Sequence, residues 1–214
     1  MLIDPIDDLP HREEPSLVEQ WQFDFWSPEH DLGGWTHFTY DQSSRKGWYV
    51  TVLVGVDRQI VLVVDPKIQI PQLTQYLEFR AEGIWAQHVC ETPLEHWTVG
   101  LEAFGVTLET AEDAMGNQWG KRTGVGLDLE WEQIGKPEST DSGFSQQCLV
   151  TGEVLIDDEV IDLNAQGWRS RSWSSNLDVI DRPKGNGIHI DVGGIVLTIE
   201  PNFSGQQWHG RLSR

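Results

Sequence analysis

Residues 152–173 read GEVLIDDEVIDLNAQGWRSRSW, and this stretch decides the fold. Apolar and polar residues alternate on both sides of Asp157-Asp158, which is the pattern of a β-hairpin with that pair at its turn. Side chains two residues apart on a strand point to the same face of the sheet. Arg169 and Arg171 are therefore expected on one face of the second strand, and Trp168 on the other.

The same period of two runs through most of the 214 residues. Segments such as 21–25 and 77–90 alternate in polarity, and turn-forming Gly, Pro, Asp and Asn residues separate them. The only helix that the sequence predicts is a short one at 109–115. Many strands with minimal helix predict an all-β fold, either an antiparallel barrel or a sandwich.

Changes of composition suggest how the chain is divided. Residues 1–16 are acidic and interrupted by prolines, which predicts a flexible arm. Residues 134–143 are rich in Gly, Pro, Ser and Thr, as linkers are. We therefore expect two β halves, 17–133 and 144–214, packed against each other. Whether the second half is truncated or closes is left open.

The charge of the chain excludes some partners. Its 15 Lys and Arg against 34 Asp and Glu give a net charge of −19, which repels nucleic acids and anionic membranes. No apolar run reaches the roughly 20 residues that span a bilayer, and the first residues lack the pattern of a signal peptide. Cys90 and Cys148 are expected to be reduced thiols. These features predict a cytoplasmic protein.

Three segments together resemble one family. They are EQWQFDFW with LGG at 19–34, ETPLEHW at 91–97, and the 152–173 hairpin preceded by DLEW at 128–131. In this order they resemble the lipocalin-like proteins related to hydroxyneurosporene synthase (carotenoid hydratase). The resemblance covers roughly residues 17–176 and implies lipocalin-like β halves that enclose apolar space. It also implies hydration, cyclisation or rearrangement of isoprenoid-like or polyketide-like molecules.

The chain departs from the family pattern where acid–base chemistry is expected. The family motif in the third segment is Gly-x-Arg-Asp-His-Ser-Trp-Gly-x-Arg, and the chain matches it at Gly167, Arg169, Ser172 and Trp173. Ser170 and Arg171 stand in place of the motif's Asp and His, and Ser174 and Asn176 replace its last Gly and Arg. The two groups best suited to proton transfer are therefore missing.

His96 is the best remaining candidate for a catalytic residue, because histidine titrates near neutral pH. His88 lies on the preceding strand and is expected to face it if the turn falls near Thr92. If Arg169 and Arg171 face inward, the pair could bind a carboxylate or other oxygen anion bidentately. Alternatively, they pair with the many surface carboxylates. The chain shows no spacing typical of a metal or cofactor site.

The eleven tryptophans fit either a thick core or the aromatic walls of a pocket. We favour a protein that binds an isoprenoid-, steroid- or polyketide-like molecule in a Trp-lined cavity, with hydratase, isomerase or cyclase activity left open. A carbohydrate-binding β-sandwich and a structural protein that dimerises are the alternatives. The candidate ligand-binding residues are Trp85, His88, Trp97, Trp131, Arg169, Arg171 and Trp173.

Overall fold

The computed structural model describes residues 2–12, 14, 16–55, 57–70, 76–109 and 120–175, apart from the side chains of 66 and 67, and the backbone of 188–192, 195–201 and 208–213. A 3₁₀ helix, η1, spans Pro5–Asp8. The strands are β1 (Val18–Ser27), β2 (Leu32–Asp41), β3 (Lys46–Gly55), β4 (Ile60–Gln69), β5 (Tyr76–Ala81), β6 (Ile84–Thr92), β7 (His96–Leu108), β8 (Lys121–Gln133), β9 (Glu138–Ser139), β10 (Gly143–Ile156), β11 (Glu159–Ser174), β12 (Ile188–Val192), β13 (Ile195–Pro201) and β14 (Trp208–Ser213). The helix predicted at 109–115 lies almost wholly outside the described residues.

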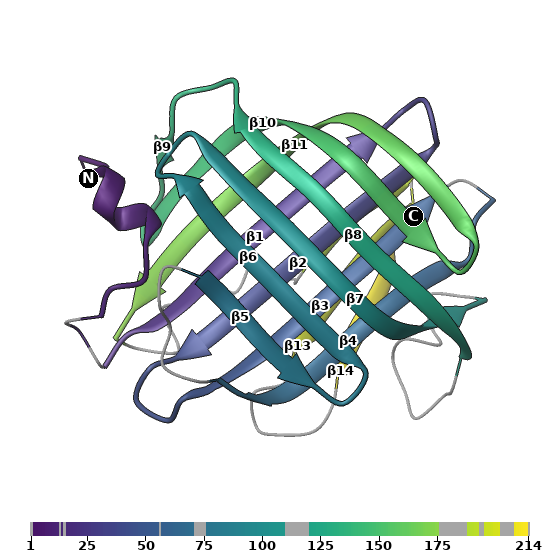
Figure 1. The fold of residues 1–214 in the computed structure, drawn as a ribbon, viewed down its shortest axis with the longest axis horizontal. Helices are drawn as coiled ribbons and strands as arrows, with labels where there is room; N and C mark the ends of the chain where they lie inside the picture. Colours follow the sequence, from purple (N-terminus) through teal and green to yellow (C-terminus); the bar gives the residue numbers. More distant parts are fainter. Residues whose placement is uncertain are drawn as a thin grey trace.

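Eight strands close into an antiparallel barrel, which is one of the two all-β architectures that the sequence predicts. Their order is β1-β2-β3-β4-β7-β8-β10-β11, and β11 returns to β1 (Figure 1). β5 and β6 form a hairpin that continues the sheet alongside β7. The hairpin of residues 152–173 is confirmed, with Ile156 paired to Glu159 across the Asp157-Asp158 turn.

The barrel closes through a change of partner along β7. Residues up to Ala103 pair with β6, whereas 106–108 pair with the first residues of β4. Gly105 lies between these two regions. A Cβ atom at this position would lie 2.7 Å from the carbonyl oxygen of Leu62. Only glycine lets β4 approach β7 closely enough to pair with it.

The barrel has two ends that the turns define. The hairpin end carries the β1–β2, β3–β4 and β10–β11 turns. The arm end carries η1, β9 and the β6–β7 turn, and Figure 1 shows η1 on the opposite side of the barrel from the β10–β11 turn. The N-terminal arm is therefore positioned to cover one end of the barrel only.

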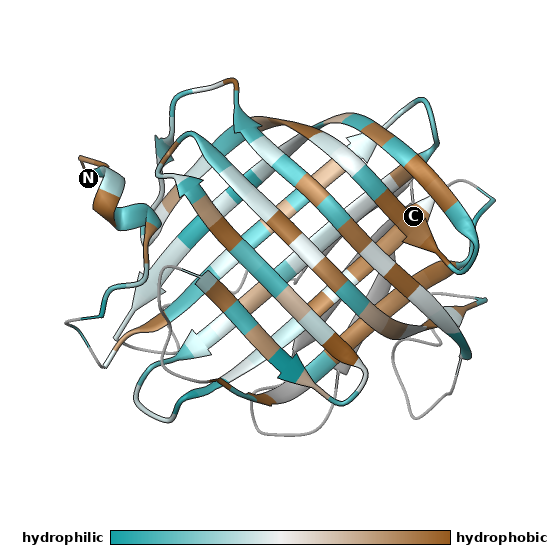
Figure 2. Cartoon of the chain, in the orientation of Figure 1, coloured by the Kyte–Doolittle hydropathy of each residue, from teal (hydrophilic) through white to brown (hydrophobic). Residues whose placement is uncertain are grey.

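Large aromatic side chains fill much of the barrel interior. Trp21, Phe23, Phe38, Trp97 and Trp131 are all at most 2% exposed and belong to one core cluster. They come from alternate positions of their strands, and Figure 2 shows the resulting bands of hydrophobic and hydrophilic residues along the strands. Burial of each removes roughly 150–250 Å² from water. This apolar interior stabilises the barrel.

A second apolar cluster lies on the outer face of β2, β3 and β4. It contains Trp35, Trp48, Val50, Val52 and Val54. An outward face this apolar needs a cover. β12 lies beside β3 and belongs to a separate three-stranded sheet, β12-β13-β14, drawn in yellow behind the barrel in Figure 1.

The boundary expected at 134–143 falls within the barrel. Strands β8 and β10 flank this segment and pair with each other, and β11 pairs with β1. Residues 17–133 and 143–174 therefore contribute to one sheet, and the change of sheet comes after Ser174. Turn-forming residues mark a connection between strands equally well in a hairpin and in a domain linker, so composition alone placed the division too early.

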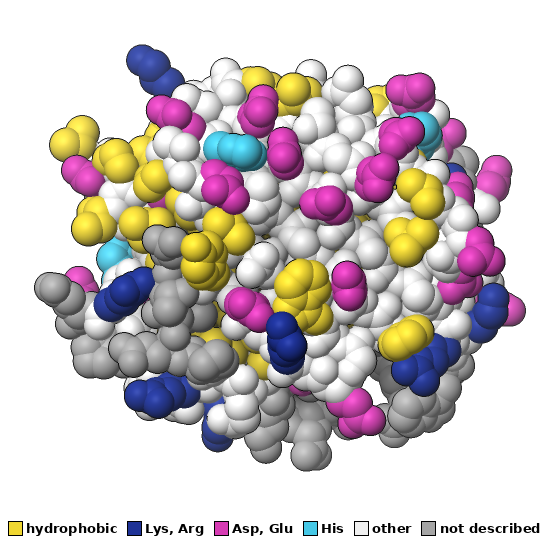
Figure 3. All heavy atoms as spheres, viewed as in Figure 1, with side chains coloured by type: hydrophobic (Ala, Val, Ile, Leu, Met, Phe, Trp, Pro, Cys, Tyr) yellow, Lys and Arg dark blue, Asp and Glu magenta, His cyan; other side chains and the backbone are white. Residues whose placement is uncertain are grey.

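The outer surface is acidic. Figure 3 shows Asp and Glu side chains scattered over the face that carries β5 to β8, with few Lys and Arg side chains among them. Cys90 and Cys148 are both free thiols, as predicted. In the part of the chain that the structure describes, no helix has the length and apolar character needed to cross a membrane.

Candidate functional site

Arg169 and Arg171 both point into the barrel. On β11 they pair with Phe23 and Trp21 of β1, whose side chains are part of the interior core. The two arginines are only 3% and 1% exposed, whereas Trp168, the residue before Arg169, is 40% exposed on the outside. Arg169 and Arg171 thus lie on the same face of β11, as predicted, and this face lines the barrel interior.

Asp8, from η1, neutralises Arg169. Nη1 and Nη2 of Arg169 donate to the two oxygens of the Asp8 carboxylate at 2.6 and 3.0 Å. Nη2 also donates to Oε1 of Gln146 at 2.6 Å. Asp8 is completely buried, although it belongs to the arm that the sequence predicts to be flexible. The acidic partner that an inward arginine needs therefore comes from the protein itself.

Glu19 pairs with Arg171 through one of its carboxylate oxygens, and both side chains are fully buried. Arg171 also donates to the backbone carbonyls of Ser172 and Leu9, at 2.9 and 3.1 Å. Burial acts to raise the pKa of Glu19, but the Arg171 charge and hydrogen bonds from His11 and Arg171 outweigh it and lower that pKa. The pairing is therefore ionic at neutral pH.

His88 is buried in the interior without a polar partner. Neither ring nitrogen makes a hydrogen bond, and the side chain is 0% exposed. The rings of Phe23, Tyr49 and Phe38 surround it at centroid distances of 5.4, 5.8 and 6.4 Å. Burial lowers the pKa of His88 to about 3, so the imidazole is neutral. Buried polar groups without partners are uncommon and often mark functional positions.

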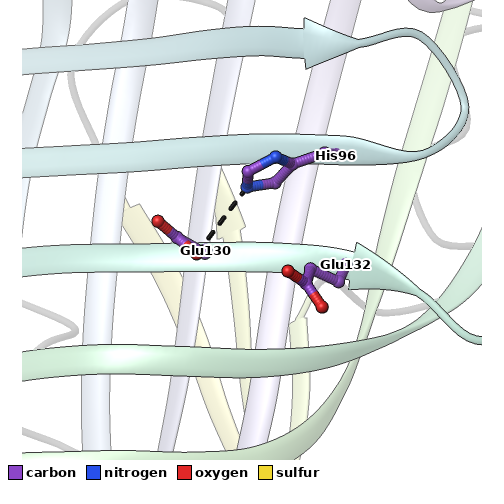
Figure 4. Close-up of side chains that lie close together, drawn as sticks. All are labelled: His96, Glu130 and Glu132. Carbon is purple, nitrogen blue, oxygen red and sulfur yellow. Dashed lines mark ion pairs between the residues drawn. The ribbon is translucent and has the colours of Figure 1, made fainter.

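His96 lies on the outer face of β7, because its neighbour Trp97 points inward. It pairs with Thr92 across the β6–β7 turn, whereas His88 pairs with Val99, so the two histidines do not face each other. Nε2 of His96 lies 3.8 Å from Oε2 of Glu130, and Glu132 lies next to both (Figure 4). Ligand-type atoms of these three side chains lie within 4.8 Å of one another, and both carboxylates are exposed.

The tryptophans predicted to bind ligand occupy three different environments. Trp97 and Trp131 are buried in the interior, and their indole N–H groups donate to Asp8 at 3.1 Å and to the carbonyl of Asp24 at 3.2 Å. Trp173 lies at the arm end, 4.7 Å from the ring of His11. Trp85 is partly exposed on β6 and donates to Glu78. Of the predicted residues, His88, Trp97, Trp131 and the two arginines share the interior.

A pocket of about 260 Å³ opens at the hairpin end. Bidentate hydrogen bonds of 2.8 and 2.9 Å join Arg58 to Glu159 at its rim, and Lys121 lies 3.6 Å from Asp157. The described residues that line it are Leu32, Leu53, Val54, Arg58, Gln59, Val61, Thr107, Lys121, Ile156, Asp157 and Glu159.

Sequence reasoning missed this pocket. Its described lining contains no tryptophan and none of the predicted site residues. Alternation in the sequence indicates that Leu53 and Val61 face inward, but it does not show where along the barrel a space remains unfilled. The position of such a space depends on how side chains from several strands pack together.

A closed eight-stranded antiparallel barrel, with a short N-terminal helix covering one end and a pocket at the other, defines a lipocalin-like protein. The chain belongs to the family described as Domain of unknown function (DUF7064), whose model matches residues 4–176. The closed barrel supports the lipocalin-like part of the expected resemblance, and the family match does not single out the hydroxyneurosporene synthase branch. No curated protein shows significant sequence similarity to the chain.

Solved structures of similar proteins include CghA, with and without Sch210972. The complex is 14% identical with a TM-score of 0.48, and the match covers 86% of this chain and 53% of CghA. The second CghA structure is 15% identical with a TM-score of 0.48, at 94% and 58% coverage. The AttH candidate NE1406 from Nitrosomonas europaea is 14% identical with a TM-score of 0.37, at 99% and 72% coverage. The chain thus spans little more than half the length of CghA.

Proposed function

We propose that this protein binds a hydrophobic small molecule with one polar end, in the pocket at the hairpin end. The pocket itself carries the proposal, because Leu32, Leu53, Val61 and Ile156 give a space of about 260 Å³ an apolar part, and polar and charged side chains line the rest. Ligand pockets have mostly apolar walls and volumes of roughly 300–1,000 Å³. A pocket just below this range accommodates one ring system or a short chain, with the remainder of the molecule at the mouth.

The rim favours an uncharged ligand. Arg58 and Lys121 are matched by Glu159 and Asp157, so the rim offers polar contacts without a net charge. The net charge of −19 repels anionic molecules from the surface. Isoprenoid-, steroid- and polyketide-like molecules that carry a hydroxyl or carbonyl group meet both conditions. The sequence resemblance to proteins related to hydroxyneurosporene synthase supports the same classes.

Binding, rather than catalysis, is the primary function that we propose. Hydration, isomerisation or cyclisation needs a proton donor or acceptor beside the ligand. Asp157 and Glu159 are the carboxylates of the described pocket lining, and both are ion-paired. His96, the expected catalytic residue, lies on the outer face of β7. The free thiols of Cys90 and Cys148 support a cytoplasmic setting.

No specific observation favours the alternatives of a carbohydrate-binding module or a structural dimer. A carbohydrate platform uses exposed, coplanar aromatic faces. Among the tryptophans whose side chains the structure describes, Trp168 is the most exposed, at 40%. A single partly exposed indole does not form such a platform.

The test is a pair of adjacent substitutions on β10. Ile156→Trp adds a bulky ring inside the pocket, whereas Leu155→Trp adds the same ring on the outer face, where Leu155 is 37% exposed. We expect isothermal titration with a panel of isoprenoid alcohols, sterols and polyketide-like ketones to find at least one saturable ligand. Ile156→Trp should weaken its binding at least tenfold, and Leu155→Trp should not change it. Equal binding by both variants, or no binding to the unaltered protein, contradicts the proposal.

A further inference from the structure

We propose that the arm end of the barrel carries a second binding site, a receptor for the carboxylate of an apolar acid, which this chain occupies with its own Asp8. The site lies at the opposite end from the pocket of the proposed function. It also binds a different chemical class of ligand, an acid instead of an uncharged molecule. Either proposal can therefore fail without the other.

Donors from several barrel elements converge on the Asp8 carboxylate. Besides the two bonds from Arg169, its Oδ2 accepts from the backbone N–H of Leu94 at 2.6 Å and the indole N–H of Trp97 at 3.1 Å. The Cys90 thiol lies 3.9 Å away and points its sulfur at the same oxygen. Proteins recognise a carboxylate by pairing it with the planar, charged guanidinium of an arginine and by adding further N–H donors. The Asp8 carboxylate has both. Every one of these donors belongs to the barrel, and the arm supplies only the acid.

The barrel holds the donors in place without help from Asp8. Gln146 accepts from Arg169 and donates to the backbone carbonyls of Leu94 and Gly135, at 2.9 and 3.0 Å. It therefore ties the guanidinium to the β6–β7 turn. Leu94 in that turn has a φ of 63°, a conformation that a leucine rarely adopts. Backbone strain of this kind concentrates at binding sites, and here it aims the Leu94 N–H at the carboxylate.

The occupant is attached through several polar contacts. η1 is four residues long, and its Ile6 and the preceding Leu2 are 66% and 93% exposed, whereas Ile3, Leu9 and Pro10 are half-buried. Beyond Asp8, the carbonyl of Leu9 accepts from Arg171 and the N–H of His11 donates to Glu19. Departure of the arm would break these contacts, and it would leave Arg169 as a buried cation with an empty carboxylate position.

The surroundings of the site select the ligand. Trp97, Cys90 and the ring of Phe144, which lies 5.3 Å from the Arg169 guanidinium, border the carboxylate position. These neighbours favour an acid with an apolar chain over a small polyanion. Asp8 is tethered and competes at an effective concentration on the order of millimolar. A free acid must therefore displace it at similar or higher concentration.

The first test removes the internal carboxylate. Asp8→Ala leaves a vacancy beside Arg169, and Asp7→Ala removes the same charge from the same turn without touching Arg169. We expect sodium formate to raise the thermal midpoint of Asp8→Ala saturably, with half the effect at millimolar concentration. Sodium chloride and formamide should have no such effect, and Asp7→Ala should not respond to formate. The proposal is overturned if formate raises the thermal midpoint of Asp8→Ala and Asp7→Ala equally. It is also overturned if Asp8→Ala folds but does not respond to formate.

The second test uses the unaltered protein and remains decisive if Asp8→Ala does not fold. Trypsin cuts after Arg, and Arg12 is exposed in the arm. A protease needs several residues of extended chain around the bond, so release of Asp8 should make this cut faster. We expect sodium hexanoate to accelerate this cut at least threefold relative to equal concentrations of hexanol and sodium chloride. Asp8→Asn, which keeps the shape but loses the charge, should be cut at least threefold faster without hexanoate. A cutting rate that hexanoate and Asp8→Asn both leave unchanged would show that Asp8 is a permanent structural residue.

Discussion

The guanidinium of Arg171 lies over the indole of Trp21, with its carbon 3.9 Å from the ring centroid. The two residues are direct partners across the β1–β11 ladder, so the contact joins the first and last strands of the barrel. Glu19, two residues before Trp21, completes the arrangement by pairing with the same guanidinium. The cation is thus held between an aromatic face and a carboxylate where the barrel closes.

Removal of the Arg171 charge should destabilise the protein strongly. Arg171→Met leaves the Glu19 carboxylate buried without its partner, and we expect a loss of about 3–5 kcal/mol in the free energy of unfolding. Urea unfolding followed by tryptophan fluorescence measures this loss. Adding Glu19→Gln to Arg171→Met should recover part of it, because the unpaired charge is then gone.

The control for this prediction is the exposed pair Arg58 and Glu159, whose side chains are 29% and 50% exposed. Arg58→Met should cost less than about 1 kcal/mol, since water screens such a pair. Similar losses for Arg58→Met and Arg171→Met would mean that burial does not determine the strength of the Arg171 pairing.

Replacement of Asp24 should change how stability depends on pH. Burial raises the pKa of the Asp24 carboxyl to about 6 from its ordinary value of 3.8, against a hydrogen bond from the Trp168 N–H. Between these two values the folded protein keeps a proton that the unfolded chain has released, so stability falls as the pH rises through this window. The free energy of unfolding of Asp24→Asn should therefore be about 1–2 kcal/mol higher than that of the unaltered protein at pH 7.5. Below pH 4 the two should not differ.

Chemical unfolding at closely spaced pH values measures the Asp24 effect. Asp128→Asn is the matched control, because Asp128 is an exposed carboxylate on an outward position of β8. It should leave the pH profile unchanged. An Asp24→Asn profile parallel to that of the unaltered protein would contradict a raised Asp24 pKa.

His88→Leu should stabilise the protein near neutral pH. The imidazole has no hydrogen-bond partner, and an unsatisfied buried polar group costs about 1–3 kcal/mol, so we expect a gain of about 1 kcal/mol. Because the folded pKa of about 3 lies below the ordinary 6.5, the unaltered protein loses stability as the pH falls through this window. Thermal unfolding between pH 4 and pH 8 should show that His88→Leu reduces this loss, and His37 should account for a further part of it.

His37 provides the comparison for His88. Burial also lowers its pKa to about 3, but its ring stacks on Trp48 at 4.3 Å and hydrogen-bonds to Thr39 at 2.8 Å. His37→Leu should therefore destabilise the protein at pH 7.5 while it also reduces the acid sensitivity. Effects of equal sign for both substitutions would indicate that the missing hydrogen bonds of His88 do not matter.

Gly105→Ala should weaken the closure of the barrel. Its new methyl group would meet the Leu62 carbonyl oxygen at 2.7 Å and the Val63 side chain at 2.9 Å, which is too close for either to stay in place. We expect a loss of about 1–3 kcal/mol and faster amide exchange at the β4–β7 pairing. Gly100→Ala on the same strand has its nearest neighbour at 3.5 Å and should cost less than half as much.

Much of the strand pattern could be predicted because alternation is local. The turn at Asp157-Asp158, the shared face of Arg169 and Arg171, and the outward position of Trp168 all follow from a period of two along one segment. The same rule places His96 outside once Trp97 is taken as core. The prediction of His96 as a catalytic residue rested on its chemistry alone, without regard to this alternation.

The amino-acid sequence by itself determined that the protein is an antiparallel β fold and that two arginines of one strand point the same way. Only the tertiary structure decided what they meet: Asp8 lies 161 residues before Arg169 along the chain, and Glu19 lies 152 residues before Arg171. It also decided that an unfilled space remains at the hairpin end, lined by residues of several strands. The direction of a side chain depends on its own strand, whereas its partners depend on the order and register in which distant strands close the barrel.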